Sequence, residues 1–210
     1  VVEARTHGRY LVRPPDGPEP WPVLAGFHGY AETAEVHMDA LARIPGADSW
    51  LLVSVQALHR FYTREQRIVG SWMTRQDREL AIADNVDYVS RVLASVRSEF
   101  ATRAPLVVAG FSQGGAMAYR GAATLGAAAT IVLGADVPPD VTASPHRLTR
   151  VLIGRGTLDE WYTAQKHAED LAALASSGVR VESCVFDGGH DWSEPFYAAA
   201  GRVLAELASR

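Results

Sequence analysis

Cysteine is almost missing from this chain of 210 residues, because Cys184 is the only one. An internal disulfide is therefore excluded, which fits a reducing compartment, and we expect a cytoplasmic protein. Lysine is equally scarce, since Lys166 is the only lysine among 20 basic residues. The arginines are scattered and the net charge is −4, so the composition argues against a nucleic-acid partner.

Long apolar runs are also missing. No stretch reaches the ~20 apolar residues that a membrane-spanning helix requires. The longest candidate, residues 121–135, is rich in Ala and Gly and is interrupted by Thr124 and Thr130. The first ten residues lack the cationic-then-apolar pattern of a signal peptide, whether or not the natural chain begins earlier. We expect no membrane span, and the hydrophobic content of 48% is that of a globular protein.

Ligand patterns for metals and cofactors are absent from the sequence as well. No His, Cys or Asp spacing is typical of a metal site. Residues 154–159 (Gly-Arg-Gly-Thr-Leu-Asp) follow an apolar run as a dinucleotide-binding loop would, but they lack its third glycine. The prediction is a protein with no metal and no cofactor.

Strand-like runs alternate with helical patterns along the chain, which is typical of a mostly parallel sheet built from βαβ units. One domain, residues 1–210, is the simplest division at this length. Residues 61–67 are predicted to be a loop, either packed on the surface or forming a wall of a substrate cleft. Strands are predicted at residues 9–13, 23–28, 50–55, 105–110, 130–133, 151–153 and 179–186. Helices are predicted at residues 33–44, after a Thr74/Asp77 capping box, after Ser112, and at residues 160–176 and 195–208.

The most informative segment is Gly110-Phe-Ser-Gln-Gly-Gly115, which directly follows the apolar run 105–109. The pattern predicts a strand that turns sharply into a helix with Ser112 at the apex. That is the G-x-S-x-G nucleophile elbow, in which the strained turn exposes the serine hydroxyl above the sheet. The helix that follows would aim its first N–H groups at the serine.

A serine hydroxyl needs a base within hydrogen-bond reach, and the base needs a carboxylate that fixes its tautomer. In an α/β-hydrolase sheet the chain order is serine, acid, histidine, each at the carboxyl end of a strand. Asp159 and His190 fit this order, since each follows a predicted strand and precedes a predicted helix. The competing acids are Asp136, Asp187 and Asp191. Of the other histidines, His146 is assigned to a polar loop.

Two backbone N–H groups are expected to stabilise the oxyanion of the reaction. One belongs to Gln113, the residue after the serine. The other is predicted to be that of Tyr30, in the loop that follows the strand ending at Phe27. His28 is expected to orient this loop rather than to take part in chemistry.

These motifs together resemble the phospholipase/carboxylesterase family, which includes acyl-protein thioesterases and small bacterial carboxylesterases. The resemblance covers nearly the whole chain in order, and it implies an α/β-hydrolase fold with helices on both faces of the sheet and no cofactor. It maps the catalytic triad onto Ser112, Asp159 and His190. The motifs are His28-Gly29, Ser71-Trp72, the segment 110–115, Asp159 and His190. Only a short Pro-containing loop lies between residues 134 and 150, so no lid domain is expected.

The chain departs from the family around its predicted substrate site. Where the family often has His-Gly-Asp-x-Asp before its acid, this chain has residues 154–159, and Met73-Thr74 replaces the usual Phe-Asp after Ser-Trp. We predict that Trp72 and Trp161 crowd the space beyond Ser112, with Met73 and Leu158 beside them. The expected enzyme is a serine carboxylesterase for small esters with short- to medium-chain acyl groups.

Two other functions stay open at this point. An acyl thioesterase or lysophospholipase would use the same machinery, and a catalytically silent hydrolase fold would act as a binding module. The silent module predicts the loss of a triad member, and the sequence has all three. A homodimer also stays open.

Overall fold

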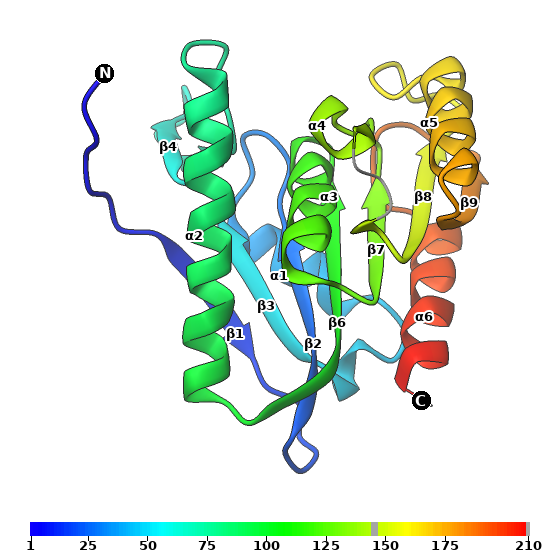
Figure 1. The fold of residues 1–210 in the computed structure, drawn as a ribbon, viewed down its shortest axis with the longest axis horizontal. Helices are drawn as coiled ribbons and strands as arrows, with labels where there is room; N and C mark the ends of the chain where they lie inside the picture. The colour runs from blue at the N-terminus through cyan, green and yellow to red at the C-terminus, as the bar shows by residue number, and fades with distance from the viewer. Residues whose placement is uncertain (144–146, 209–210) are drawn as a thin grey trace.

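A single seven-stranded sheet organises the computed structural model, which describes residues 1–143 and 147–208 (Figure 1). Its strands are β1 (Arg9–Arg13), β2 (Trp21–Phe27), β3 (Leu51–Gln56), β6 (Thr102–Phe111), β7 (Ala129–Leu133), β8 (Arg150–Gly156) and β9 (Arg180–Phe186). Their order is β1-β3-β2-β6-β7-β8-β9, and every neighbouring pair is parallel except β1 with β3. The predicted α/β-hydrolase sheet is confirmed, with its antiparallel strand at the edge.

Helices cover both faces of this sheet, and each face has its own apolar core. Helices α2 (Arg78–Glu99), α3 (Gln113–Leu125), α4 (Pro139–Thr142) and α5 (Ala164–Ser176) pack on one face; α1 (Ala34–Ala42), the short 3₁₀ helix η1 (Ala47–Ser49) and α6 (Glu194–Ala208) pack on the other. Alternate side chains of a strand point to opposite faces. On β6, Val108 therefore belongs to the first core, while Val107 and Ala109 belong to the second.

A β-hairpin stands beside the main sheet where the sequence predicted a loop. It consists of β4 (His59–Tyr62) and β5 (Ile68–Ser71), which pair antiparallel. Each strand is only four residues long, and the connection from Thr63 to Arg67 contains no glycine, so the usual hairpin signals are weak. The hairpin joins the rest of the fold through an isolated bridge between Glu32 and Gly70.

Two helix starts differ from the predictions. The Thr74/Asp77 capping box is wrong: α2 begins at Arg78, Asp77 makes no side-chain cap, and Thr74 Oγ1 donates to Gln76 O instead. Helix α5 begins at Ala164, with Thr163 as its N-cap, rather than at Glu160. Its start is delayed because Asp159 accepts the backbone N–H groups of the two residues that would have formed the first turn.

Within the described ranges, no helix has both the length and the apolar character that crossing a bilayer would require. The same ranges contain no cluster of three or more His, Cys, Asp or Glu side chains arranged to hold a metal ion.

Candidate active site

Ser112 lies at the sharp turn between β6 and α3, with φ 51° and ψ −124°. A non-glycine residue in this left-handed region is strained, and such strain is concentrated at functional sites. The turn fits only because its glycines lack side chains: a Cβ at Gly110 would overlap the carbonyl of Gly114, and a Cβ at Gly114 would overlap the carbonyl of Phe27. The backbone N–H of Ser112 donates to Leu133 O at 2.9 Å, which fixes the turn to β7.

A continuous chain of hydrogen bonds links the three side chains proposed as a triad. His190 Nε2 lies 2.8 Å from Ser112 Oγ, and His190 Nδ1 lies 2.8 Å from Asp159 Oδ2. A carboxylate can only accept, so the Nδ1–H group donates to Asp159 and Nε2 accepts the serine hydroxyl. This is the tautomer that a general base requires. The three residues come from the ends of β6, β8 and β9, which are brought together at one edge of the sheet.

The carboxylate of Asp159 is held from several sides. Its side chain is 1% exposed, and its Oδ1 accepts the N–H groups of Trp161 and Tyr162, each at 2.9 Å. With Oδ2 facing His190, both oxygens are engaged. A buried carboxylate whose two oxygens are both hydrogen-bonded has little freedom to rotate.

The competing acids lie away from the imidazole or make other bonds. Asp136 pairs with Lys166 Nζ at 3.2 Å on the surface. Asp187 accepts the Thr157 hydroxyl at 3.3 Å, and Asp191 accepts the backbone N–H of Trp192. Geometry therefore favours Asp159 over all three. The predicted polar loop around His146 lies outside the described residues.

The two backbone N–H groups predicted for the oxyanion hole, those of Tyr30 and Gln113, belong to segments that adjoin Ser112. Gln113 is the first residue of α3, so its N–H has no acceptor one turn earlier. The loop that carries Tyr30 packs against the same turn, because a Cβ at Gly29 would lie 3.1 Å from a ring carbon of Phe111. Within the described chain, the N–H groups of Tyr30 and Gln113 have no hydrogen-bond acceptor.

The side chain of Gln113 has a separate structural task. Its Oε1 accepts the backbone N–H of Trp72 at 2.8 Å, and its Nε2 donates to Ser71 Oγ at 3.2 Å. The residue that offers its N–H beside Ser112 thus also ties the start of α3 to the segment after β5. The sequence alone did not indicate this second contact.

His28 orients its loop, as expected from the sequence. Its Nδ1–H donates to Gly29 O at 2.7 Å, and its Nε2 accepts the N–H of Ala57 at 3.0 Å. Burial lowers the pKa of His28 below its usual value, which keeps the ring neutral. A neutral ring can donate from one nitrogen and accept at the other, as this loop requires.

Trp72 does not line a substrate site, which corrects the sequence prediction. Its side chain is 0% exposed and packs edge-on to Phe27 in the core. Its indole N–H donates to His28 O at 2.8 Å. The tryptophan supports the loop before Tyr30 from inside, so it cannot crowd the space beyond Ser112.

Trp161 and Leu158 lie on the open surface on either side of Asp159, with exposed fractions of 76% and 70%. The two indoles therefore do not fill a common slot. Met73 is half-buried beside Gln113, whose Nε2 donates to Met73 O at 3.4 Å. The ring of Tyr30 stacks on that of Phe61 in the β4–β5 hairpin, with ring centroids 5.5 Å apart. Of the four predicted substrate residues, Trp72 is thus buried, Met73 is half-buried, and Leu158 and Trp161 form an exposed rim.

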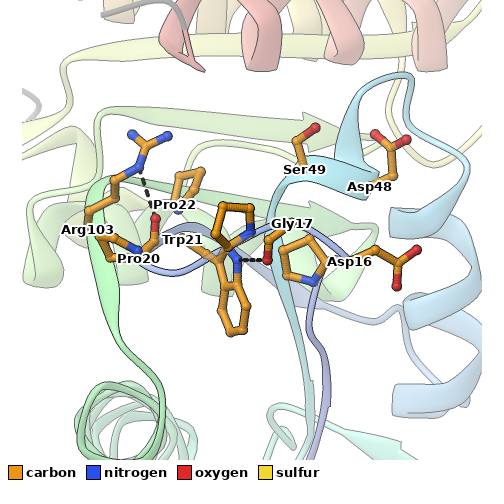
Figure 2. A pocket seen from close by; sticks show the side chains of 10 residues that line it. Asp16, Gly17, Pro20, Trp21, Pro22, Asp48, Ser49 and Arg103 are labelled. Carbon is orange, nitrogen blue, oxygen red and sulfur yellow. Dashed lines mark hydrogen bonds between the residues drawn. The ribbon is translucent and has the colours of Figure 1, made fainter.

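A hollow of about 320 Å³ has none of these residues in its lining. Figure 2 shows the residues that line it. It is formed by the Pro-rich turn between β1 and β2, by η1 and by Arg103, and the Trp21 indole N–H donates to Gly17 O within it. Arg103 and Ser112 are at opposite ends of β6, roughly 30 Å apart at the rise of a strand. This hollow is therefore separate from the candidate active site.

Comparisons with known proteins give a clear answer on the fold. No family model and no curated protein matches the sequence. Among solved structures, esterase PE8 superimposes with a TM-score of 0.76 at 19% identity over 96% of this chain and 100% of that one. The carboxylesterase of Bacillus cereus gives a TM-score of 0.71 at 16% identity over 95% of this chain and 94% of that one. Acyl-protein thioesterase 2 of Zea mays gives 0.72 at 15% identity over 95% of this chain and 99% of that one.

The fold is that of the α/β-hydrolase esterases. A phospholipase/carboxylesterase of Dyadobacter fermentans shares it too, with a TM-score of 0.71 at 16% identity over 97% of this chain and 99% of that one. These neighbours are consistent with the family that the sequence motifs resemble. At such identities the likeness establishes the fold, and the activity has to be argued from the site.

Proposed function

We propose that this protein is a serine hydrolase that cleaves carboxylic esters through an acyl-enzyme intermediate. The observation that carries the proposal is the hydrogen-bond chain from Ser112 through His190 to Asp159, with Ser112 strained at the strand–helix turn. A buried, fully hydrogen-bonded carboxylate behind the imidazole is the arrangement that activates a serine hydroxyl. A binding module without catalytic activity would not require this arrangement of the three side chains.

The proposed reaction follows from the geometry. Ser112 Oγ attacks the acyl carbonyl while His190 Nε2 takes its proton, and Asp159 stabilises the resulting imidazolium. The N–H groups of Tyr30 and Gln113 hold the negative oxygen of the tetrahedral intermediate. His190 then returns the proton to the leaving alcohol. Water, deprotonated by the same histidine, releases the acid from Ser112.

The substrates we propose are small esters with short- to medium-chain acyl groups. The support is the exposure of Leu158 and Trp161 beside the triad, since a chain lying on such a rim keeps one side in water. Each fully buried methylene would add about 0.8 kcal/mol of binding, and a half-exposed one adds less. Long chains therefore gain little over medium ones.

Ser112→Ala tests the proposal. The variant should lose ester hydrolysis by several orders of magnitude while folding normally, because the triad acts as a unit. A fluorophosphonate should label the wild type at Ser112 only, as read by mass spectrometry. The matched control is Ser49→Ala, an exposed serine near the remote hollow, which should keep full activity and labelling. Labelling at another residue, or an active Ser112→Ala enzyme, would refute the assignment.

Thioester hydrolysis is the second candidate, because one structure with this fold is named an acyl-protein thioesterase. The same three side chains would perform it. Matched ester and thioester substrates with acyl groups from acetyl to dodecanoyl separate the two. We expect the ester series to be favoured and to level off beyond hexanoyl; a preference for thioesters of long chains would reverse the ranking.

A further inference from the structure

Glu32 occupies an unusual position in the loop between β2 and α1. Its carboxylate Oε2 accepts the backbone N–H of Gly29 at 2.7 Å, so the side chain folds back over the loop that carries Tyr30. Its own backbone carbonyl accepts the N–H of Gly70 at 2.9 Å. One residue thus connects the proposed oxyanion loop with the β4–β5 hairpin. Sequence reasoning did not single it out, although an acid three residues after His28-Gly29 was visible.

The loop that Glu32 closes is strained. Ala31, between Tyr30 and Glu32, has φ 59°, a left-handed conformation that a residue with a Cβ rarely adopts. Such a conformation persists only where surrounding contacts fix it. The contacts on either side are Ala31 N–H to Gly70 O at 3.0 Å and the Glu32 carboxylate on Gly29. The direction of the Tyr30 N–H therefore depends on both.

The charge of Glu32 has no structural counter-ion. Burial raises the pKa of its carboxyl above the usual value, the bond from Gly29 opposes this, Asp191 raises it further and His190 lowers it. Glu32 lines a hollow between α1 and the Asp191–Trp192 segment, which is separate from the hollow beside Arg103. The other charged groups that line it are Asp191, Asp39 and Arg43, and Arg43 donates to Glu194 at 2.7 Å. In the described chain Glu32 makes no ion pair, so its main polar contact is the loop backbone.

From these contacts we infer that Glu32 is a positioning residue, which holds the Gly29–Tyr30 turn so that the Tyr30 N–H points at the developing oxyanion. The inference rests on the proposed function, because it assigns Glu32 a task in that reaction. Oxyanion donors act because they are oriented before the reaction, so an N–H group without a fixed orientation loses most of its effect. Glu32 itself touches no reacting atom.

The test compares Glu32→Ala, Glu32→Gln and the control Asp39→Asn. Alanine removes the acceptor and should lower kcat about 10- to 100-fold, less than the 10²–10³ reported for deleting a donor outright. KM should stay within about threefold, because the ground-state ester does not need the oriented N–H. Glutamine keeps an acceptor oxygen and should recover kcat to within about fivefold of wild type. Asp39 lines the hollow beside Glu32, and its carboxylate pairs with Arg13 on β1 at 3.6 Å, so its variant should stay within about twofold.

Equal losses in the alanine and glutamine variants, or a normal kcat in Glu32→Ala, would overturn the inference. Amide NMR gives a readout that does not need activity and that serves if Glu32→Ala fails to fold. In the wild type the Gly29 N–H resonance should shift as Glu32 titrates, and this shift should vanish in Glu32→Gln. A Gly29 signal that ignores pH refutes the contact. Failure of the proposed function would instead show as absent labelling of Ser112 with the Gly29 titration intact.

Discussion

The indole N–H of Trp72 donates to the backbone oxygen of His28 at 2.8 Å from within the hydrophobic core. His28 in turn fixes Gly29 and accepts the N–H of Ala57. The loop that presents Tyr30 is thereby supported from below by a residue that never meets solvent. The contacts of Trp72 therefore serve both the packing of the core and the geometry proposed for the oxyanion hole.

Trp72→Phe should separate the two roles of this side chain, packing in the core and support of the loop that presents Tyr30. Phenylalanine keeps most of the aromatic packing but leaves the buried carbonyl of His28 without its donor, which costs about 1–3 kcal/mol. We expect a lower urea midpoint and a lower kcat. Trp21→Phe is the matched control, because it also removes an indole bond to a backbone oxygen, that of Gly17, at the remote end of the sheet. It should leave kcat unchanged; equal effects on kcat would contradict the coupling.

Asp159→Asn should reduce kcat by about 10⁴, because an amide can hold the imidazole in the wrong tautomer. Asp136→Asn removes only a surface pair with Lys166, and such pairs contribute about 0–1 kcal/mol to stability. Its kcat should remain within about twofold. The measurement is steady-state kinetics on one nitrophenyl ester, and the reverse ranking would mean that the acid is Asp136, in the segment after β7.

The sheet, and the choice of the three side chains proposed as a triad, could be predicted because both follow from local patterns. Apolar runs of four to eight residues bounded by turns specify buried strands, and the nucleophile, acid and base follow such strands in chain order. Chain order favoured Asp159 and His190 while leaving Asp136 as a competing acid, and the hydrogen bond between Asp159 and His190 agrees with the first choice. Local signals of this kind do not depend on which side chains meet across the fold.

The role of Trp72 and the hairpin were not predictable for the opposite reason. Whether an indole faces a cleft or the core is decided by tertiary contacts, here the His28 carbonyl and the edge of Phe27. The start of α5 was misjudged likewise, because the Asp159 side chain takes amides that a helix would have used. Side chains that bond to their own backbone compete with helix formation in a way that composition does not reveal.

His37 should make the protein less stable in acid. Its side chain is 1% exposed, and neither ring nitrogen has a hydrogen-bond partner in the described chain. Burial, together with the nearby His28, lowers the pKa of His37 to about 3. Between that value and the usual 6.5 the unfolded chain binds a proton that the folded protein does not. Stability should thus fall as pH drops through this window, by up to roughly 1.4 kcal/mol per pH unit from this group.

His37→Leu should flatten that slope. Leucine is close in size and carries no proton, and removing an unpartnered polar group from a core is neutral or stabilising. Urea unfolding at several pH values between 4 and 7 gives the comparison, with His7→Leu near the exposed chain start as the control. A slope that is unchanged in His37→Leu would contradict the assignment to this residue.

Trp161→Ala should change substrate preference without changing stability. The side chain is 76% exposed, so the unfolding free energy should move by less than about 0.5 kcal/mol. Its backbone N–H still donates to Asp159 in the variant. We expect kcat/KM to fall about 3- to 10-fold for hexanoyl esters and less than twofold for acetyl esters, since only the longer chain reaches the ring. Val185→Ala, an exposed apolar side chain on β9, is the control; equal losses across the acyl series would refute the rim contact.

The β4–β5 hairpin is fastened to the oxyanion loop by backbone groups: Ala31 N–H to Gly70 O and Gly70 N–H to Glu32 O. Any residue with a free N–H and carbonyl can make such bonds, so they place no demand on the side chains at the hairpin tip. The connection between the two strands, residues 63–67, is therefore replaceable, whereas Phe61 on β4 stacks on Tyr30. Replacing this tip by one of different size or charge would change the surface near the Tyr30 loop. The backbone bonds between Gly70 and the loop, and the proposed catalytic residues, would stay as they are.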